Sequence, residues 1–149
     1  MLGIDYGGAR TGVAVSDPLG WTAQGLETVK GGMDGTTDQI IRIAKQYGAK
    51  TIVVGYPVNM NGSAGYQAER TDKFIEALKD KLGEETADVV KWDERLTSAE
   101  AAKILKTSGA RPTSRAVREN GKLDMLSASI LLQSYLDNKR LAAGKPGNK

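Results

Sequence analysis

The stretch that decides the fold is Ile4-Asp-Tyr-Gly-Gly-Ala-Arg-Thr-Gly-Val-Ala-Val-Ser-Asp17. Met1–Asp5 has the composition of a short apolar strand, and Thr11–Val15 is rich in the small and β-branched residues of a second strand. The glycines between them are typical of a turn. A further turn leads to Trp21–Val29, a weaker strand. Three strands joined by such short links predict an antiparallel meander.

Downstream of the meander, helical and strand patterns alternate. The expected helices are Thr37–Tyr47, Tyr66–Leu82, a segment from a capping box at Thr97 to about Thr107, and Leu123–Arg140; the expected strands are Thr51–Gly55 and Ala87–Trp92. This order predicts an α/β fold with a five-stranded mixed sheet and helices on both faces. The first strand should be central, and Lys91 marks the last strand as a sheet edge.

Composition bounds the chemistry before any motif is considered. A chain of 149 residues with 40% hydrophobic content predicts one globular domain, over 1–140, followed by a flexible basic tail over 141–149. The absence of histidine and cysteine excludes catalysis by imidazole or thiol. Neither a signal peptide nor an apolar run of about 20 residues is present in the sequence, so we expect a cytoplasmic protein.

Three carboxylates lie at the ends of apolar elements: Asp5 in the first strand, Glu94 after the last strand and Asp124 at the start of the last helix. Each alone is typical of a turn or a helix cap. At neighbouring element ends, together, they favour a site for Mg²⁺ or Mn²⁺, which prefer oxygen ligands. Strand alternation sends Asp93 and Glu94 to opposite faces, and the pattern alone leaves open which of the two enters the site.

A basic segment precedes Asp124. Within 109–122 there are four basic residues against a single acid; the basic ones are Arg111, Arg115, Arg118 and Lys122. The loop Gly109–Gly121 would then lie over the site and grip a nucleic-acid backbone. The alternative is a solvated, mobile stretch with no ligand.

Four motifs carry a resemblance to a known family. They are Ile4–Asp17, Gly55-Tyr-Pro-Val-Asn-Met-Asn-Gly62, Asp93-Glu-Arg-Leu-Thr-Ser98 and Lys122-Leu-Asp-Met-Leu-Ser-Ala128. In order and spacing they resemble the YqgF family, bacterial RuvC-resolvase-like nucleases with a ribonuclease H-type fold. Tyr56, where we expect leucine, and Asn61, where aspartate is common, depart from the family pattern. Both lie in or beside the middle loop, so the three acids are unaffected.

The resemblance implies a role in maturing the 5′ end of the small-subunit ribosomal RNA precursor, with Holliday-junction resolution as the older proposal. It places the catalytic and metal-binding acids on Asp5, Glu94 and Asp124, and thereby decides for Glu94 over Asp93. Without histidine, a cation must activate the attacking water, and two cations about 3.5–4 Å apart could stabilise both reacting oxygens.

Other polar residues near these motifs have two readings each. Arg10 and Arg95 could bind phosphate, or form ion pairs with a neighbouring carboxylate such as Asp17 or Asp93. Asn59, with its neighbours in the middle loop, could bind the backbone or merely shape turns.

Two further function classes compete with the nuclease. An actin-like phosphate-binding protein needs a second lobe and a second glycine-rich hairpin, which the sequence lacks. A non-catalytic nucleic-acid binder is disfavoured by the acids, which would repel phosphate without metal. We expect a nucleic-acid partner, structured RNA or branched DNA, and no membrane.

Overall fold

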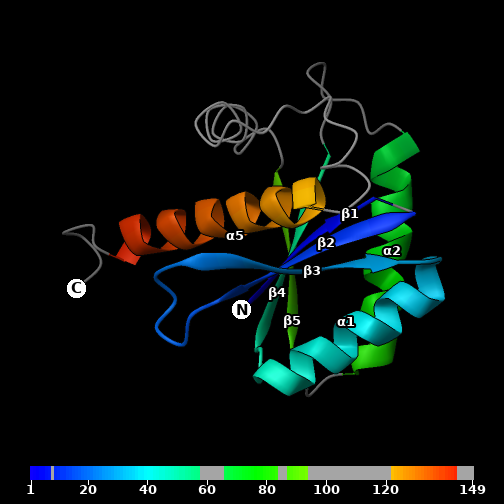
Figure 1. Ribbon diagram of the computed structural model, residues 1–149, viewed down its shortest axis with the longest axis horizontal. Helices are drawn as coiled ribbons and strands as arrows, with labels where there is room; N and C mark the ends of the chain where they lie inside the picture. The colour runs from blue at the N-terminus through cyan, green and yellow to red at the C-terminus, as the bar shows by residue number, and fades with distance from the viewer. Residues whose placement is uncertain (8, 58–65, 84–86, 94–121, 144–149) are drawn as a thin grey trace.

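A computed structural model describes residues 1–7, 9–57, 66–83, 87–93 and 122–143 (Figure 1). Its elements, in chain order, are β1 (Leu2–Tyr6), β2 (Arg10–Ser16), β3 (Ala23–Lys30), α1 (Met33–Tyr47), β4 (Thr51–Tyr56), α2 (Tyr66–Leu82), β5 (Asp88–Asp93) and α5 (Lys122–Ala143). Among the helices described, none is long and apolar enough to cross a membrane.

The five strands form one mixed sheet in the order β3-β2-β1-β4-β5. β1 pairs antiparallel with β2 and parallel with β4, and β4 pairs parallel with β5. The central place of β1 and the edge place of β5 therefore confirm two predictions. The carboxyl ends of β1, β4 and β5 meet at one edge of the sheet, which we call the carboxyl edge.

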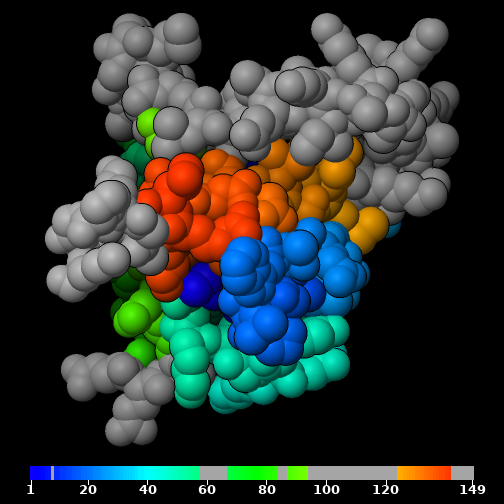
Figure 2. Space-filling model, turned by 90° about the vertical axis from the view of Figure 1, so that its left-hand side faces the viewer, coloured from blue at the N-terminus to red at the C-terminus, as the bar shows by residue number. Residues whose placement is uncertain are grey.

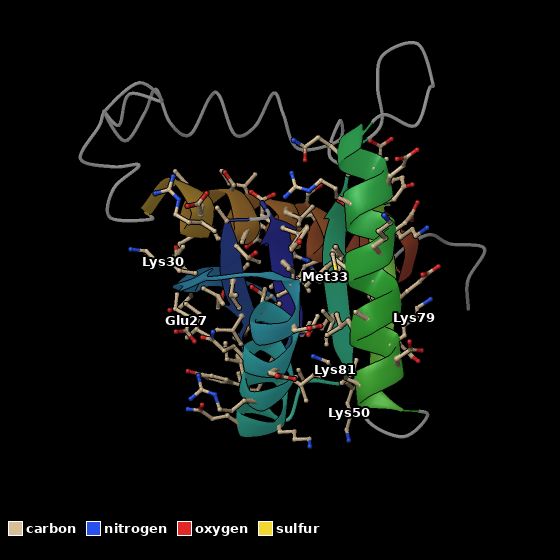
Figure 3. The ribbon with its side chains drawn as sticks, turned by 90° about the vertical axis from the view of Figure 1, so that its right-hand side faces the viewer. Glu27, Lys30, Met33, Lys50, Lys79 and Lys81 are labelled. Carbon is tan, nitrogen blue, oxygen red and sulfur yellow. The ribbon has the colours of Figure 1, made fainter. Side chains whose placement is uncertain are left out.

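Helices cover both faces of the sheet, as predicted. On one face α1 and α2 pack against a large apolar cluster that includes Leu2, Ile4 and the fully buried Phe74. Figure 3 shows these two helices in front of the strands, and Figure 2 shows α5 on the other side. Under α5 the buried residues are mostly smaller, among them Ala14 and Val53.

Alternation along β1 and β2 explains the two faces. Leu2 and Ile4 point to the α1 and α2 face, so Gly3 and Asp5 point to the α5 face. β2 repeats the arrangement, with Val13 on the first face and Ala14 on the second.

Three boundaries differ from the prediction by more than one residue. α1 begins at Met33, four residues early, because Gly32 is its N-cap and the buried Thr36 and Thr37 belong to its first turns. β3 begins at Ala23, since the amides of Trp21 and Thr22 bind the Asp17 carboxylate at 2.6 and 3.0 Å and hold a turn there. α5 continues through 141–143, so the expected tail is helical at its start.

The expected helix from Thr97 and the basic loop Gly109–Gly121 lie outside the described residues, as does 144–149. The predicted helix end at Gly48 is confirmed: its φ of 63° is left-handed, and the amides of Gly48 and Ala49 bind carbonyls in the last turn.

Candidate active site

Helix α5 lies unusually close to the sheet, above glycines. A Cβ atom built on Gly12 would lie 2.0 Å from the carbonyl oxygen of Asp124, and one on Gly3 would lie 2.7 Å from Leu132 Cβ. A Cβ on Gly25 would lie 3.0 Å from Met125 Cβ. We call Gly3, Gly12 and Gly25 the glycine seam. Because the seam has no side chains, the first turn of α5 rests directly on the backbone of β2.

The glycine seam brings Asp124 to Asp5. Asp5 is the register partner of Gly12 in the β1–β2 ladder, so their side-chain directions share a face. The Gly12 direction points at the backbone of Asp124. The structure therefore places Asp5 and Asp124 on the same face at the carboxyl edge, although 118 residues separate them in the chain.

The carboxylate of Asp124 is only partly satisfied. Its side chain is 25% exposed, and Arg10 Nε lies 3.5 Å from Oδ2. This oxygen is buried and, within the described part of the chain, accepts no hydrogen bond. A buried carboxylate oxygen without a hydrogen bond is costly unless a cation neutralises it. Its position on the same face as Asp5 suits a metal ligand.

The structure gives Arg10 an ion-pair partner that the sequence analysis did not name. Asp17 lies at the opposite edge of the sheet, since the amide of the preceding Ser16 binds the carbonyl of Met1. The Asp17 carboxylate caps its own turn, and the amide of Thr22 lowers its pKa. Asp17 therefore lies away from the site, and Arg10 forms an ion pair with Asp124.

Asp93 points away from Asp124. It pairs with Tyr56 across the β4–β5 ladder, and the Tyr56 hydroxyl reaches Asp72 of α2. The preceding Trp92 packs on the α5 face, where its ring meets Tyr135 edge-on. Asp93 is therefore on the α2 face. Glu94 lies outside the described residues, directly after β5, and its place as the third acid stays a prediction.

A polar network ties β4 and β5 to α2 near the carboxyl edge. Asp72 accepts hydrogen bonds from the Tyr56 hydroxyl at 2.9 Å and from Lys91 Nζ at 2.8 Å. The Lys91 ammonium holds the pKa of Asp72 below its usual value, and Asp72 in turn raises the pKa of Lys91 and of Tyr56. Tyr56, which departs from the family pattern, thus has a structural partner of its own.

Of the other residues predicted to contact nucleic acid, one lies within the described residues. Lys122 begins α5. The others lie outside the described residues: Arg95, Asn59, Arg111, Arg115 and Arg118. Within the described ranges, which do not include Glu94, no three acidic side chains lie close enough together to hold a metal ion.

One basic residue near the site escaped the sequence analysis. Lys30 ends β3 and is the register partner of Arg10, so both side chains are on the α5 face. Figure 3 shows Lys30 projecting from the end of β3, on the side where α5 begins. Assigning strands one by one along the sequence does not give the register between them, and this register is what places Lys30 beside Arg10.

A hollow of about 620 Å³ lies at the opposite edge of the sheet, with Met1, Asp17 and Lys50 among its lining residues. The hollow is remote from Asp5 and Asp124, so it is not part of this site.

Comparison with known proteins identifies the family. A family model described as "RuvX: Holliday junction resolvase" matches residues 1–138. The chain belongs to the RuvX family. This match confirms the resemblance to YqgF proteins that the four motifs indicated, and it sets aside the actin-like and non-catalytic alternatives.

Close relatives extend over almost the whole chain. A protein of Ruminiclostridium cellulolyticum named "Putative pre-16S rRNA nuclease" is 44% identical over 148 residues, which cover 97% of each chain. A protein of Geobacillus thermodenitrificans with the same name is 44% identical over 143 residues, 93% of this chain and 98% of its own. The enzyme class expected from the sequence, a nuclease, is thereby confirmed.

Solved structures confirm the ribonuclease H-like fold. "T. thermophilus RuvC in complex with Holliday junction substrate" aligns with a TM-score of 0.63 at 16% identity and covers 98% of this chain and 99% of its own. "Crystal structure of Fowlpox virus resolvase and substrate Holliday junction DNA complex" aligns with a TM-score of 0.57 at 14% identity, over 93% and 97% of the two chains. At such identities the likeness concerns the fold alone.

Proposed function

We propose that this RuvX-family protein is a metal-dependent nuclease that matures the 5′ end of the small-subunit ribosomal RNA precursor in the cytoplasm. One observation carries the proposal. The first strand and the last helix place Asp5 and Asp124 on one face at the carboxyl edge, and a buried oxygen of Asp124 accepts no hydrogen bond within the described residues.

The residues present fit a divalent cation. Carboxylate oxygens are ligands that Mg²⁺ and Mn²⁺ prefer, and an incompletely satisfied carboxylate is available to bind one. Asp5 and Asp124 would hold the metal, with Glu94 as the proposed third ligand. When bound, one or two such ions would supply Lewis acidity and lower the pKa of the attacking water. The chain has no histidine or cysteine that could act as base or nucleophile in their place.

The protein's own residues bind and orient the substrate. Arg10 lies beside Asp124, within reach of a phosphate drawn to the carboxyl edge, and a guanidinium can bind two phosphate oxygens together. The glycine seam fixes the first turn of α5, so the Asp124 carboxylate is held in place before substrate arrives. Arg95, Asn59, Arg111, Arg115, Arg118 and Lys122 are proposed contacts to the backbone.

Two observations bear on the substrate. The relatives' names support ribosomal RNA precursor, whereas the description of the family model supports a four-way DNA junction as the second candidate. Both are phosphodiesters with a dense negative charge, so the described site is compatible with either.

Incubation of the purified protein with each substrate, with Mg²⁺ or Mn²⁺ and with EDTA, tests the proposal. We expect metal-dependent cleavage of the RNA precursor near its mature 5′ end, and weaker or no cleavage of the junction. Asp5→Asn should abolish cleavage and leave the melting temperature within a few degrees, because Asp5 is a half-buried residue at a strand end. Undiminished cleavage by this variant would refute the site, and cleavage of the junction alone would refute the substrate.

A further inference from the structure

The contact between Arg10 and Asp124 has a geometry of its own. The Nε–Oδ2 distance of 3.5 Å is longer than the 2.7–2.9 Å of a charge-assisted hydrogen bond, and this oxygen accepts no hydrogen bond within the described residues. The guanidinium therefore neutralises the carboxylate without saturating it. The two side chains are 33% and 25% exposed, so neither is locked inside the core.

A guanidinium in this position competes with a metal ion. A ligated divalent cation would lie about 2.0–2.1 Å from a carboxylate oxygen. Arg10 Nε already lies 3.5 Å from the oxygen of Asp124 that is buried and available. Two cationic groups on one carboxylate oxygen repel each other, so a metal ion bound there favours the withdrawal of Arg10.

The rim of the carboxyl edge offers Arg10 a second position when it leaves Asp124. Arg10 is the first residue of β2, beside the glycine turn and at the exposed rim of the carboxyl edge, with Lys30 next to it on the same face. A phosphate bound at this rim would meet both side chains, and its charge would favour the departure of Arg10 from Asp124.

We propose that Arg10 is a placeholder cation, which neutralises Asp124 in the metal-free protein and moves to a substrate phosphate when metal binds. This proposal rests on the metal site of the proposed function. The proposal implies that metal and nucleic acid bind cooperatively, because each ligand favours the departure of Arg10 from Asp124. The coupling must be reciprocal, so each ligand raises the affinity for the other by the same factor.

The first test measures Mn²⁺ affinity by electron paramagnetic resonance, without nucleic acid. Arg10→Met removes the charge and keeps much of the side-chain length, so it should tighten Mn²⁺ binding at least five-fold. Arg10→Lys, which retains a cation, should remain near wild type. Lys30→Met is the matched control: it removes one positive charge from the same face, at a residue that forms no ion pair with the described part of the chain, and should change the affinity less than two-fold.

The second test measures the affinity of a labelled single-stranded RNA oligonucleotide by fluorescence anisotropy, in EDTA and in Ca²⁺. Arg10→Met should weaken binding several-fold in Ca²⁺ and hardly at all in EDTA, where Arg10 is held by Asp124. Lys30→Met should weaken binding equally in both conditions, because its availability does not depend on metal.

The outcomes separate this proposal from the one beneath it. If Asp124→Asn binds Mn²⁺ as tightly as wild type, the metal site itself is wrong and both proposals fall. If Asp124→Asn loses Mn²⁺ but Arg10→Met binds it no better than Lys30→Met, only the placeholder role is overturned. Equal losses of RNA affinity in EDTA and Ca²⁺ for Arg10→Met would overturn it as well. Melting curves of each variant establish that it is folded.

Discussion

The close approach of α5 to β2 at Gly12 should control catalysis. In Gly12→Ala the new Cβ would lie 2.0 Å from the carbonyl oxygen of Asp124, whereas Cβ atoms in proteins keep at least 3.0 Å from such atoms. The obstructing group is backbone, which cannot rotate away, so the first turn of α5 must move by about 1 Å. A displacement of about 1 Å in a catalytic group can reduce the rate about 100-fold.

The same substitution should also reduce stability. Inserting a methyl group into a closely packed contact typically costs about 1–3 kcal/mol, so we expect a lower melting temperature and a fall in kcat of about 100-fold. Cleavage assays at saturating Mg²⁺ and urea denaturation measure the two effects separately.

Two other glycines provide matched controls. Gly3→Ala places its Cβ 2.7 Å from Leu132 Cβ, two turns along α5 from Asp124, so it should lose a similar stability but less activity. Gly35→Ala in α1 has no atom within 4 Å, and should stabilise the protein by about 0.5–1 kcal/mol with unchanged activity. Wild-type kcat in folded Gly12→Ala would refute the reasoning that the glycine seam positions Asp124.

Three more predictions follow from other parts of the molecule. Lys91 lowers the pKa of Asp72, so their interaction stabilises the fold above the unfolded pKa of about 4, and this stability is lost as the pH falls through the lower folded pKa. Asp72→Asn should therefore reduce the free energy of unfolding by about 0.2–1 kcal/mol at pH 7 and leave it unchanged near pH 2, as measured by urea denaturation at both pH values. Gln133 accepts a hydrogen bond from the amide of Ala23 and donates one to a carbonyl in the preceding turn, so Gln133→Ala should destabilise the protein by about 1–3 kcal/mol. Alanine at all three arginines of the basic loop should weaken binding to every sequence and flatten the salt dependence by up to about 0.9 log units per lost phosphate contact on duplex; an unchanged slope would reject the loop as a clamp.

Local patterns in the sequence were enough to predict the sheet. Short links fixed the meander and crossovers fixed the parallel strands, so the central place of β1 followed from topology rules alone. Lys91 correctly marked β5 as an edge strand because an exposed charge is tolerated there. The start of α1 was missed, since Gly35 reads as a turn residue although the helix passes through it.

The positions of Asp5 and Asp124 at element ends were predictable from the sequence, and their contacts were not. That Asp5 and Asp124 lie at element ends can be read from the chain, but the 2.0 Å approach at Gly12 depends on how α5 crosses three strands. The ion pair between Arg10 and Asp124 also depends on this crossing. Asp5 is the acid nearest to Arg10 in the sequence, and nothing in the sequence indicated a pair with Asp124 instead. Asp17 is also close to Arg10 in sequence, yet it lies at the other edge because β2 runs away from the carboxyl edge, antiparallel to β1.

The pairing of the first strand with the last helix has a consequence for the protein while it is being made. Chains emerge from the ribosome amino terminus first, and Asp5 appears long before α5, which follows all of the described strands. Until α5 has emerged, Asp124 is missing from the carboxyl edge, and the face with Ala14 and Val53 lacks the helix that packs on it. If Asp124 acts as proposed, a nascent or prematurely terminated chain is catalytically inert and prone to aggregate, and nuclease activity arises only once translation of α5 is complete.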